Sequence, residues 1–74
     1  MRTLCDATLY TVIDPRGTYY AIRDHDSGMV WTRPTESAAA MLANENNLVI
    51  VEQAMIQHDK LMEMASRYVP AAAN

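Results

Sequence analysis

The chain has 74 residues, half of them apolar, and a formal net charge of −3. This length suits one small domain, which removes only about 60% of its unfolded surface from water. Eleven of the apolar residues are alanine and six are methionine, so the core is thin and a second copy or a partner would stabilise it. The acidic excess lies in the second half of the chain, which disfavours nucleic-acid binding because such binding depends on clustered basic residues.

The sequence contains a single cysteine, Cys5, which therefore has no partner for a disulfide within the chain. The first residues lack the apolar core of a signal peptide, and no apolar run approaches the ~20 residues that span a membrane. We therefore expect a cytoplasmic protein with no membrane segment, and we interpret Cys5 as a packing residue.

A β-hairpin is predicted around residues 14–17, which read Asp-Pro-Arg-Gly. Asp accepts a backbone hydrogen bond at the first turn position, Pro presets φ at the second, and Gly adopts positive φ at the fourth. A three-residue loop closed by the glycine pairs residue 14 with Thr18 and sets Val12 opposite Tyr20. A shift by one residue would pair Val12 with Tyr19 and scatter the aromatic side chains, so we favour the first register.

A third strand is predicted at residues 29–32, after a second turn at residues 24–28. Pairing residue 24 with residue 29 places Trp31 opposite Ile22 and extends one apolar face of the sheet. The alternative pairing would place Trp31 over Arg23 as a cation–π contact. The Arg-Pro sequence that follows ends the strand, because Pro has no N–H to donate to the ladder.

A helix is predicted from Thr35, whose hydroxyl suits the N-cap, with Glu36 in the first turn, where the helix dipole favours an acidic side chain. Residues 38–43 are strong helix formers. The Asn-Glu-Asn-Asn run at residues 44–47 interrupts the pattern. Because Asn suits both a C-cap and an N-cap, we expect this run to join two helices.

The second predicted helix is about twenty residues long and ends near Pro70. At 100° per residue, nine apolar side chains share one arc opposite a polar face: Ile50, Val51, Ala54, Met55, Leu61, Met62, Ala65, Tyr68 and Val69. Residues 48–51 (Leu-Val-Ile-Val) would also suit a buried strand, and this alternative stays open.

The predicted fold class is α+β, with a short antiparallel β-meander of two to three strands followed by two helices, the long C-terminal helix packed on the sheet. Residues 1–70 form a single small domain in this interpretation. Residues 71–74 have nothing to pack with, so a frayed C-terminal tail is expected there.

The sequence holds no complete catalytic, cofactor or metal motif. Residues 24–28 resemble a calcium loop, but Gly28 comes one position early and Thr35 stands where a bidentate Glu is needed. His58 lies near the centre of the predicted apolar arc and is interpreted as a buried or interface histidine, most simply a core residue, with a pH switch as the alternative. We therefore expect neither an enzyme nor a bound cofactor or metal.

Some apolar residues fall outside the predicted core, on the second face of the sheet and outside the buried arc of the long helix. Flexible Met side chains suit surfaces that adapt to a partner. We therefore predict a partner-binding surface made of Leu9, Ile13, Tyr19, Arg23, Val49, Ile56 and Met64. Incidental exposure is the alternative, because single exposed hydrophobic residues are ordinary.

The function that we expect is that of a small non-enzymatic protein-binding module, forming a homodimer, that occupies a surface on a larger protein. Stoichiometric inhibitors and adaptors, such as those that phages direct against host proteins, are of this type, although no motif links the chain to them. One alternative is a nucleic-acid-associated protein that uses Arg16, Arg23 and Arg33. Another is an acidic nucleic-acid mimic that blocks a basic groove.

Overall fold

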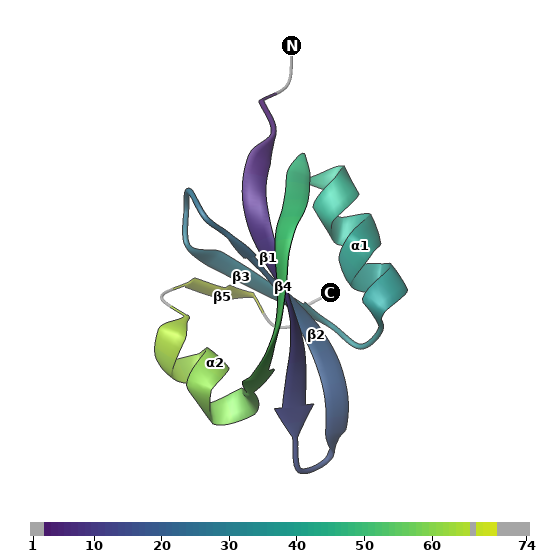
Figure 1. Ribbon diagram of the computed structural model, residues 1–74, viewed down its shortest axis with the longest axis vertical. Helices are drawn as coiled ribbons and strands as arrows, with labels where there is room; N and C mark the ends of the chain where they lie inside the picture. The colour runs from purple at the N-terminus through teal and green to yellow at the C-terminus, as the bar shows by residue number, and fades with distance from the viewer. Residues whose placement is uncertain (1–2, 66, 70–74) are drawn as a thin grey trace.

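A mixed five-stranded sheet and two helices make up the part of the chain that the computed structural model describes, residues 3–65 and 67–69 (Figure 1). The elements are β1 (Cys5–Asp14), β2 (Gly17–Asp24), β3 (Met29–Arg33), α1 (Glu36–Glu45), β4 (Leu48–Gln57), α2 (His58–Met64) and β5 (Arg67–Val69). Their order across the sheet is β4-β1-β2-β3-β5. Strands β1 to β3 form an antiparallel meander, β4 is parallel to β1, and β5 is parallel to β3. The α+β class is confirmed, but the sheet is larger than predicted.

The β1–β2 hairpin has the register that the sequence interpretation rejected. Asp14 pairs with Gly17 and Val12 pairs with Tyr19, so the loop holds only two residues. The Asp14 Oδ1 atom accepts a hydrogen bond from the Arg16 N–H at 2.9 Å, and Gly17 begins β2 with φ 143°. L side chains rarely adopt this conformation, so glycine makes the short loop possible by serving as the first strand residue.

The β2–β3 turn is built around Asp24, whose carboxylate accepts hydrogen bonds from two groups of the turn. The Gly28 N–H donates to the Asp24 carbonyl at 2.8 Å, and Gly28 has φ 75°, the left-handed conformation that glycine adopts readily. Beyond the turn, Ile22 pairs with Trp31, which confirms the predicted register. The alternative, with Trp31 over Arg23, is not adopted.

The predicted first helix and its caps are confirmed. The Thr35 hydroxyl accepts a hydrogen bond from the Ala38 N–H at 3.1 Å, and Glu36 lies in the first turn. Asn46 is the C-cap, and Asn47 has φ 57°, the left-handed conformation that Asn tolerates. The asparagine run therefore ends the helix as expected, but it joins α1 to a strand rather than to a second helix.

The long C-terminal helix does not form, because residues 48–57 pair with β1 as strand β4. The pairing runs from Leu48 opposite Cys5 to Gln57 opposite Ile13, and one extra residue, Val51, makes a bulge. The strand that was predicted as an alternative for residues 48–51 is observed and is longer. A helix here would leave one edge of β1 unpaired, whereas the ladder satisfies its backbone groups.

What remains of the predicted helix is α2, with seven residues, followed by the three-residue strand β5. Neither helix of the described residues has the length and apolar character needed to cross a membrane. The predicted tail at residues 71–74 lies outside the described residues.

Each face of the sheet is covered by one helix, and the two helices lie on opposite sides of β4 and toward its opposite ends (Figure 1). On one face, α1 packs Leu42 and two alanines against Leu9 and Ile22. On the other face, Leu61 of α2 packs against Val12 and its strand neighbours. Two small cores therefore replace the single core that the sequence predicted.

Candidate functional site

β4 is an edge strand, and most of its side chains are exposed. Among the described residues its one neighbour in the sheet order is β1, and seven of its ten residues are exposed. Val49, Val51 and Met55 are exposed by 40%, 54% and 73%, and they account for three of the five exposed large hydrophobic residues in the described chain. An edge strand with exposed apolar residues is a template on which another strand can pair.

For most apolar residues of β4, the predicted helix assigned the wrong exposure. On the predicted helix, Val51 and Met55 lie on the buried arc, and Val49 and Ile56 lie outside it. On the strand, Val51 and Met55 are exposed, and Ile56 packs against the core under α2. Val49 is exposed as predicted. The β-branched run at the start of the segment was the signal that could have identified the strand.

The structure divides the predicted partner-binding residues between the two sheet faces. Leu9 is only 5% exposed under α1, and the register places Ile13 on the same face. Tyr19 and Met64 pack against the core on the other face, where Arg23 is half-buried. The prediction that Leu9, Ile13 and Tyr19 share one face is therefore wrong, because the hairpin register differs by one residue.

The three arginines of the nucleic-acid alternative do not converge on one surface. Arg16 is exposed at the hairpin loop, and Arg23 lies on the α2 face. Arg33 pairs with Tyr20 on the α1 face, and its Nη1 atom donates to the Thr32 carbonyl at 2.6 Å. Phosphate binding is favoured by several cations along one surface, so this distribution does not favour the alternative.

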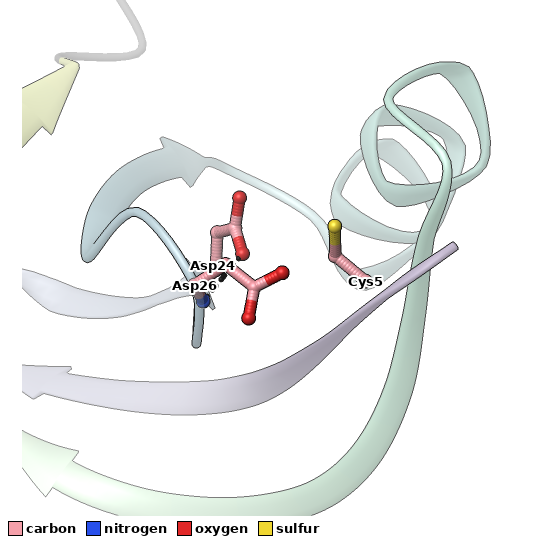
Figure 2. A group of neighbouring side chains, drawn as sticks. All are labelled: Cys5, Asp24 and Asp26. Atoms are coloured by element: carbon pink, nitrogen blue, oxygen red, sulfur yellow. Dashed lines mark hydrogen bonds between the residues drawn. The ribbon is translucent and has the colours of Figure 1, made fainter. Parts of the chain in front are cut away.

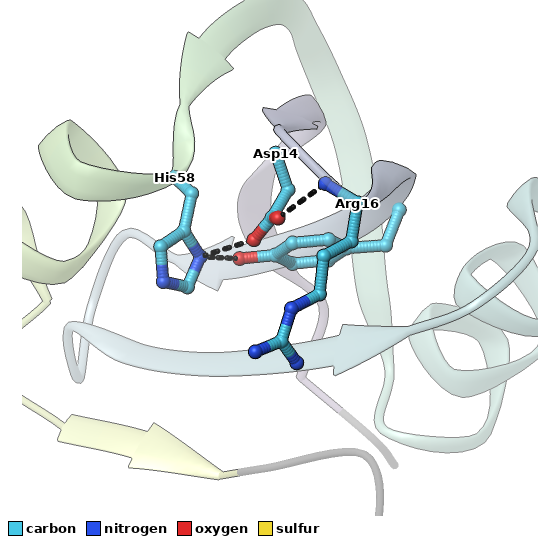
Figure 3. Close-up of polar contacts among 4 residues, drawn as sticks. Asp14, Arg16 and His58 are labelled. Atoms are coloured by element: carbon cyan, nitrogen blue, oxygen red, sulfur yellow. Dashed lines mark hydrogen bonds and ion pairs between the residues drawn. The ribbon is translucent and has the colours of Figure 1, made fainter.

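His58, the first residue of α2, contacts the end of the β1–β2 hairpin (Figure 3). Its Nδ1 atom lies 2.6 Å from the Tyr19 hydroxyl and 3.5 Å from Asp14 Oδ2. The side chain is 36% exposed, so the prediction of a buried histidine is wrong. Both contacts use the same nitrogen, whereas a nucleophile relay needs one partner on each ring nitrogen. The three groups therefore fix where α2 begins.

A shallow, open hollow lies beside this contact. Its volume is about 260 Å³, and it is lined by Asp14 and residues 16–19 of the hairpin. Sites for small molecules enclose about 300–1,000 Å³ and bury most of their ligand. The hollow falls below that range, and we assign no ligand to it.

Cys5, Asp24 and Asp26 lie close together where β1 begins beside the β2–β3 turn (Figure 2), and their potential ligand atoms are all within 4.8 Å of one another. A hydrogen bond to Asp26, desolvation and the charges of nearby carboxylates raise the pKa of the Cys5 thiol. Metal binding would need the thiolate. Both Asp24 oxygens also accept hydrogen bonds within the turn, from the Asp26 N–H and the Ser27 hydroxyl. These groups therefore build the turn, and Cys5 packs against the α1 core.

A buried threonine ties β4 to the rest of the sheet. Thr8 is 2% exposed, and its hydroxyl donates to Glu52 Oε1 at 3.1 Å and lies 2.7 Å from His25 Nε2. Because the hydroxyl has one proton, which Glu52 accepts, His25 Nε2 acts as the donor to Thr8. This chain of contacts holds the one charged side chain of β4 in place.

No family model, curated protein or solved structure matches the chain. The three polar clusters described above each join two or more elements of the fold. The β4 edge differs from them, because its exposed apolar residues have no such role in the described structure.

Proposed function

We propose that the chain is a small non-enzymatic protein-binding module that recognises its partner by strand addition at β4. The observation that carries this proposal is an edge strand of ten residues whose exposed side chains include Val49, Val51 and Met55. In strand addition, main-chain hydrogen bonds along the edge provide affinity, and the alternating side chains provide specificity. Occupying a partner strand in this way suits an inhibitor or an adaptor.

The two faces of β4 present different chemistry to an added strand. Beyond the bulge at Val51, Gln53 and Met55 pair with Leu9 and Thr11 on one face, whereas Glu52 and Ala54 lie on the other. An added strand would therefore meet the exposed Met55 on one face and a single carboxylate on the other. Partner segments with an apolar residue opposite Met55 and no acidic residue opposite Glu52 fit best.

The protection of the β4 edge is limited to its first half. Natural edge strands avoid pairing through charged side chains, proline or bulges. β4 has one bulge, at Val51, and one charge, at Glu52, and residues 53–57 contain neither proline nor a charged residue. The second half of the edge is therefore open to a partner.

Peptides selected from a displayed random library against the chain test this proposal. The selected peptides should slow amide hydrogen exchange along β4, and Met55→Lys should weaken their binding at least about tenfold. Thr18→Lys is the matched control, because Thr18 is an exposed strand residue on β2, which does not adjoin β4. Selected peptides that protect other elements, or that bind Met55→Lys as tightly as the unmodified chain, would contradict strand addition.

A further inference from the structure

The residues of β4 beyond its bulge also indicate which segment fits its edge, an inference that rests on the proposed function. From Glu52 to Gln57 the strand pairs with β1 without interruption, so an added strand meets these residues in regular succession. We propose that the partner is a basic extended segment, with Lys or Arg opposite Glu52 and an apolar residue opposite Met55. These two partner residues are three positions apart, so their side chains lie on opposite faces of the sheet.

The carboxylate of Glu52 is anchored to the sheet by a hydrogen bond. Glu52 is exposed, and its Oε1 atom accepts from the buried Thr8 hydroxyl at 3.1 Å. Among the side chains that the structure describes, none forms an ion pair with Glu52. His25 contacts the Thr8 hydroxyl, and Arg23 lies on the same face as Glu52 but two strands away from β4. The carboxylate can therefore accept a cation from a partner.

A cation on an added strand would lie much closer to Glu52 than Arg23 does. Neighbouring strands are about 4.8 Å apart, so the added strand lies about 5 Å from β4 and the strand of Arg23 about 10 Å from it. At physiological ionic strength the Debye length is about 8 Å, so exposed charges at the larger separation are largely screened from each other. A strand that covered Glu52 without supplying a cation would take the carboxylate out of water uncompensated, which is unfavourable. The edge should therefore accept basic segments and reject neutral or acidic ones.

Thr8 makes this ion pair stronger than an ordinary exposed one. Exposed ion pairs contribute little, partly because two long side chains must be ordered to form them. Here Thr8, which is 2% exposed, already orders Glu52. His25 Nε2 donates to the Thr8 hydroxyl and so leaves the hydroxyl proton for the carboxylate. Thr8 is therefore a positioning residue, and Glu52 is the residue that contacts the partner.

Parallel selections from one displayed peptide library test the charge preference. Peptides selected by the unmodified chain should slow amide exchange along β4 and carry Lys or Arg three positions from a large apolar residue. Peptides selected by Glu52→Lys should carry Asp or Glu at that position instead. Glu36→Lys is the matched control, because it reverses an exposed carboxylate of α1 rather than of the edge. It should select the same basic peptides as the unmodified chain.

One selected basic peptide, measured beside a version with Gln in place of the basic residue, tests the role of Thr8. The basic version should bind the unmodified chain about two- to fivefold more tightly, and this ratio should fall toward one in Glu52→Gln. Thr8→Val removes the hydroxyl and should also lower the ratio, whereas Thr8→Ser retains the hydroxyl and should preserve it. A purely structural loss in Thr8→Val would weaken both peptides equally and leave the ratio unchanged, which would overturn the positioning role.

The selections also separate the basic partner from strand addition itself. Selected peptides that protect β4 but lack a preferred basic position, or that bind Glu52→Gln as tightly as the unmodified chain, would overturn the basic partner and leave strand addition standing. Glu52 would then only protect the edge from pairing. Basic peptides that protect elements other than β4 would overturn both proposals.

Discussion

β1 and β4 are parallel neighbours of ten residues each, and they differ sharply in burial. In β1 only Asp6 is exposed, whereas seven residues of β4 are exposed. Apolar content does not explain this difference, because β4 has seven apolar residues and β1 has six. Burial in this sheet is therefore set by a strand's place in the sheet order rather than by its hydrophobicity.

The neighbours of each strand supply the physical reason. β1 lies between β4 and β2, and both of its faces are covered, with Leu9 under α1 and Val12 under α2. In the part of the chain that the structure describes, β4 has one neighbouring strand, and three of its residues contact the two cores: Leu48, Ile50 and Ile56. The apolar residues between these contacts are left at the surface, where a partner could cover them.

The largest effect should come from comparing one truncation in each strand. Leu9→Ala removes a buried side chain under α1 and should lower the free energy of unfolding by about 2–5 kcal/mol. Met55→Ala, at an exposed site, should change it by less than about 0.5 kcal/mol in the monomer. Urea unfolding at a concentration where the chain is monomeric measures both. Similar losses in the two variants would show that β4 is covered in the single chain.

A smaller effect should come from the contact that fixes where β4 ends and α2 begins. Tyr19→Phe removes the hydroxyl that lies 2.6 Å from His58 Nδ1 and should lower the free energy of unfolding by about 1 kcal/mol. Amide exchange of α2 should accelerate more than that of α1, because α1 packs on the other face. Tyr20→Phe is the control on the same strand. Equal acceleration of both helices would contradict a local role for this contact.

The smallest effect on the fold should come from the thiol at the start of β1. Asp26→Asn removes the carboxylate that accepts the thiol hydrogen bond, so the pKa of Cys5 should fall and its alkylation at mildly alkaline pH should become several-fold faster. Because the folded-state pKa of Cys5 is raised, the associated stability is present below the ordinary thiol pKa and is lost as pH rises through the raised value. The rate of iodoacetamide labelling measures the change in the pKa of Cys5, and Glu36→Gln is a distant control. An unchanged rate would contradict the role of Asp26.

Part of the candidate site was accessible from the sequence, and part was not. The prediction of a contact surface included Val49, which lies on the exposed edge, but it omitted Val51 and Met55. They were omitted because residues 50–69 were predicted as a helix, and on that helix both side chains lie on the buried arc. The hairpin register was lost for a related reason. Gly17 was assigned to the loop, whereas it is the first residue of β2. This shift of one residue places Leu9 and Tyr19 on opposite faces of the sheet instead of on the same face.

The sequence by itself determined the elements whose signals are local. Thr35, Glu36 and the alanine run specify α1, and the two glycine turns specify the meander of β1, β2 and β3. Only the tertiary structure decided that residues 48–57 form a strand, because their pairing partner, β1, lies about forty residues earlier in the chain. The local pattern of apolar residues contains no information about an unpaired strand edge elsewhere in the chain. Once that edge is available, its backbone hydrogen bonds outweigh a helical pattern that the isolated segment also satisfies.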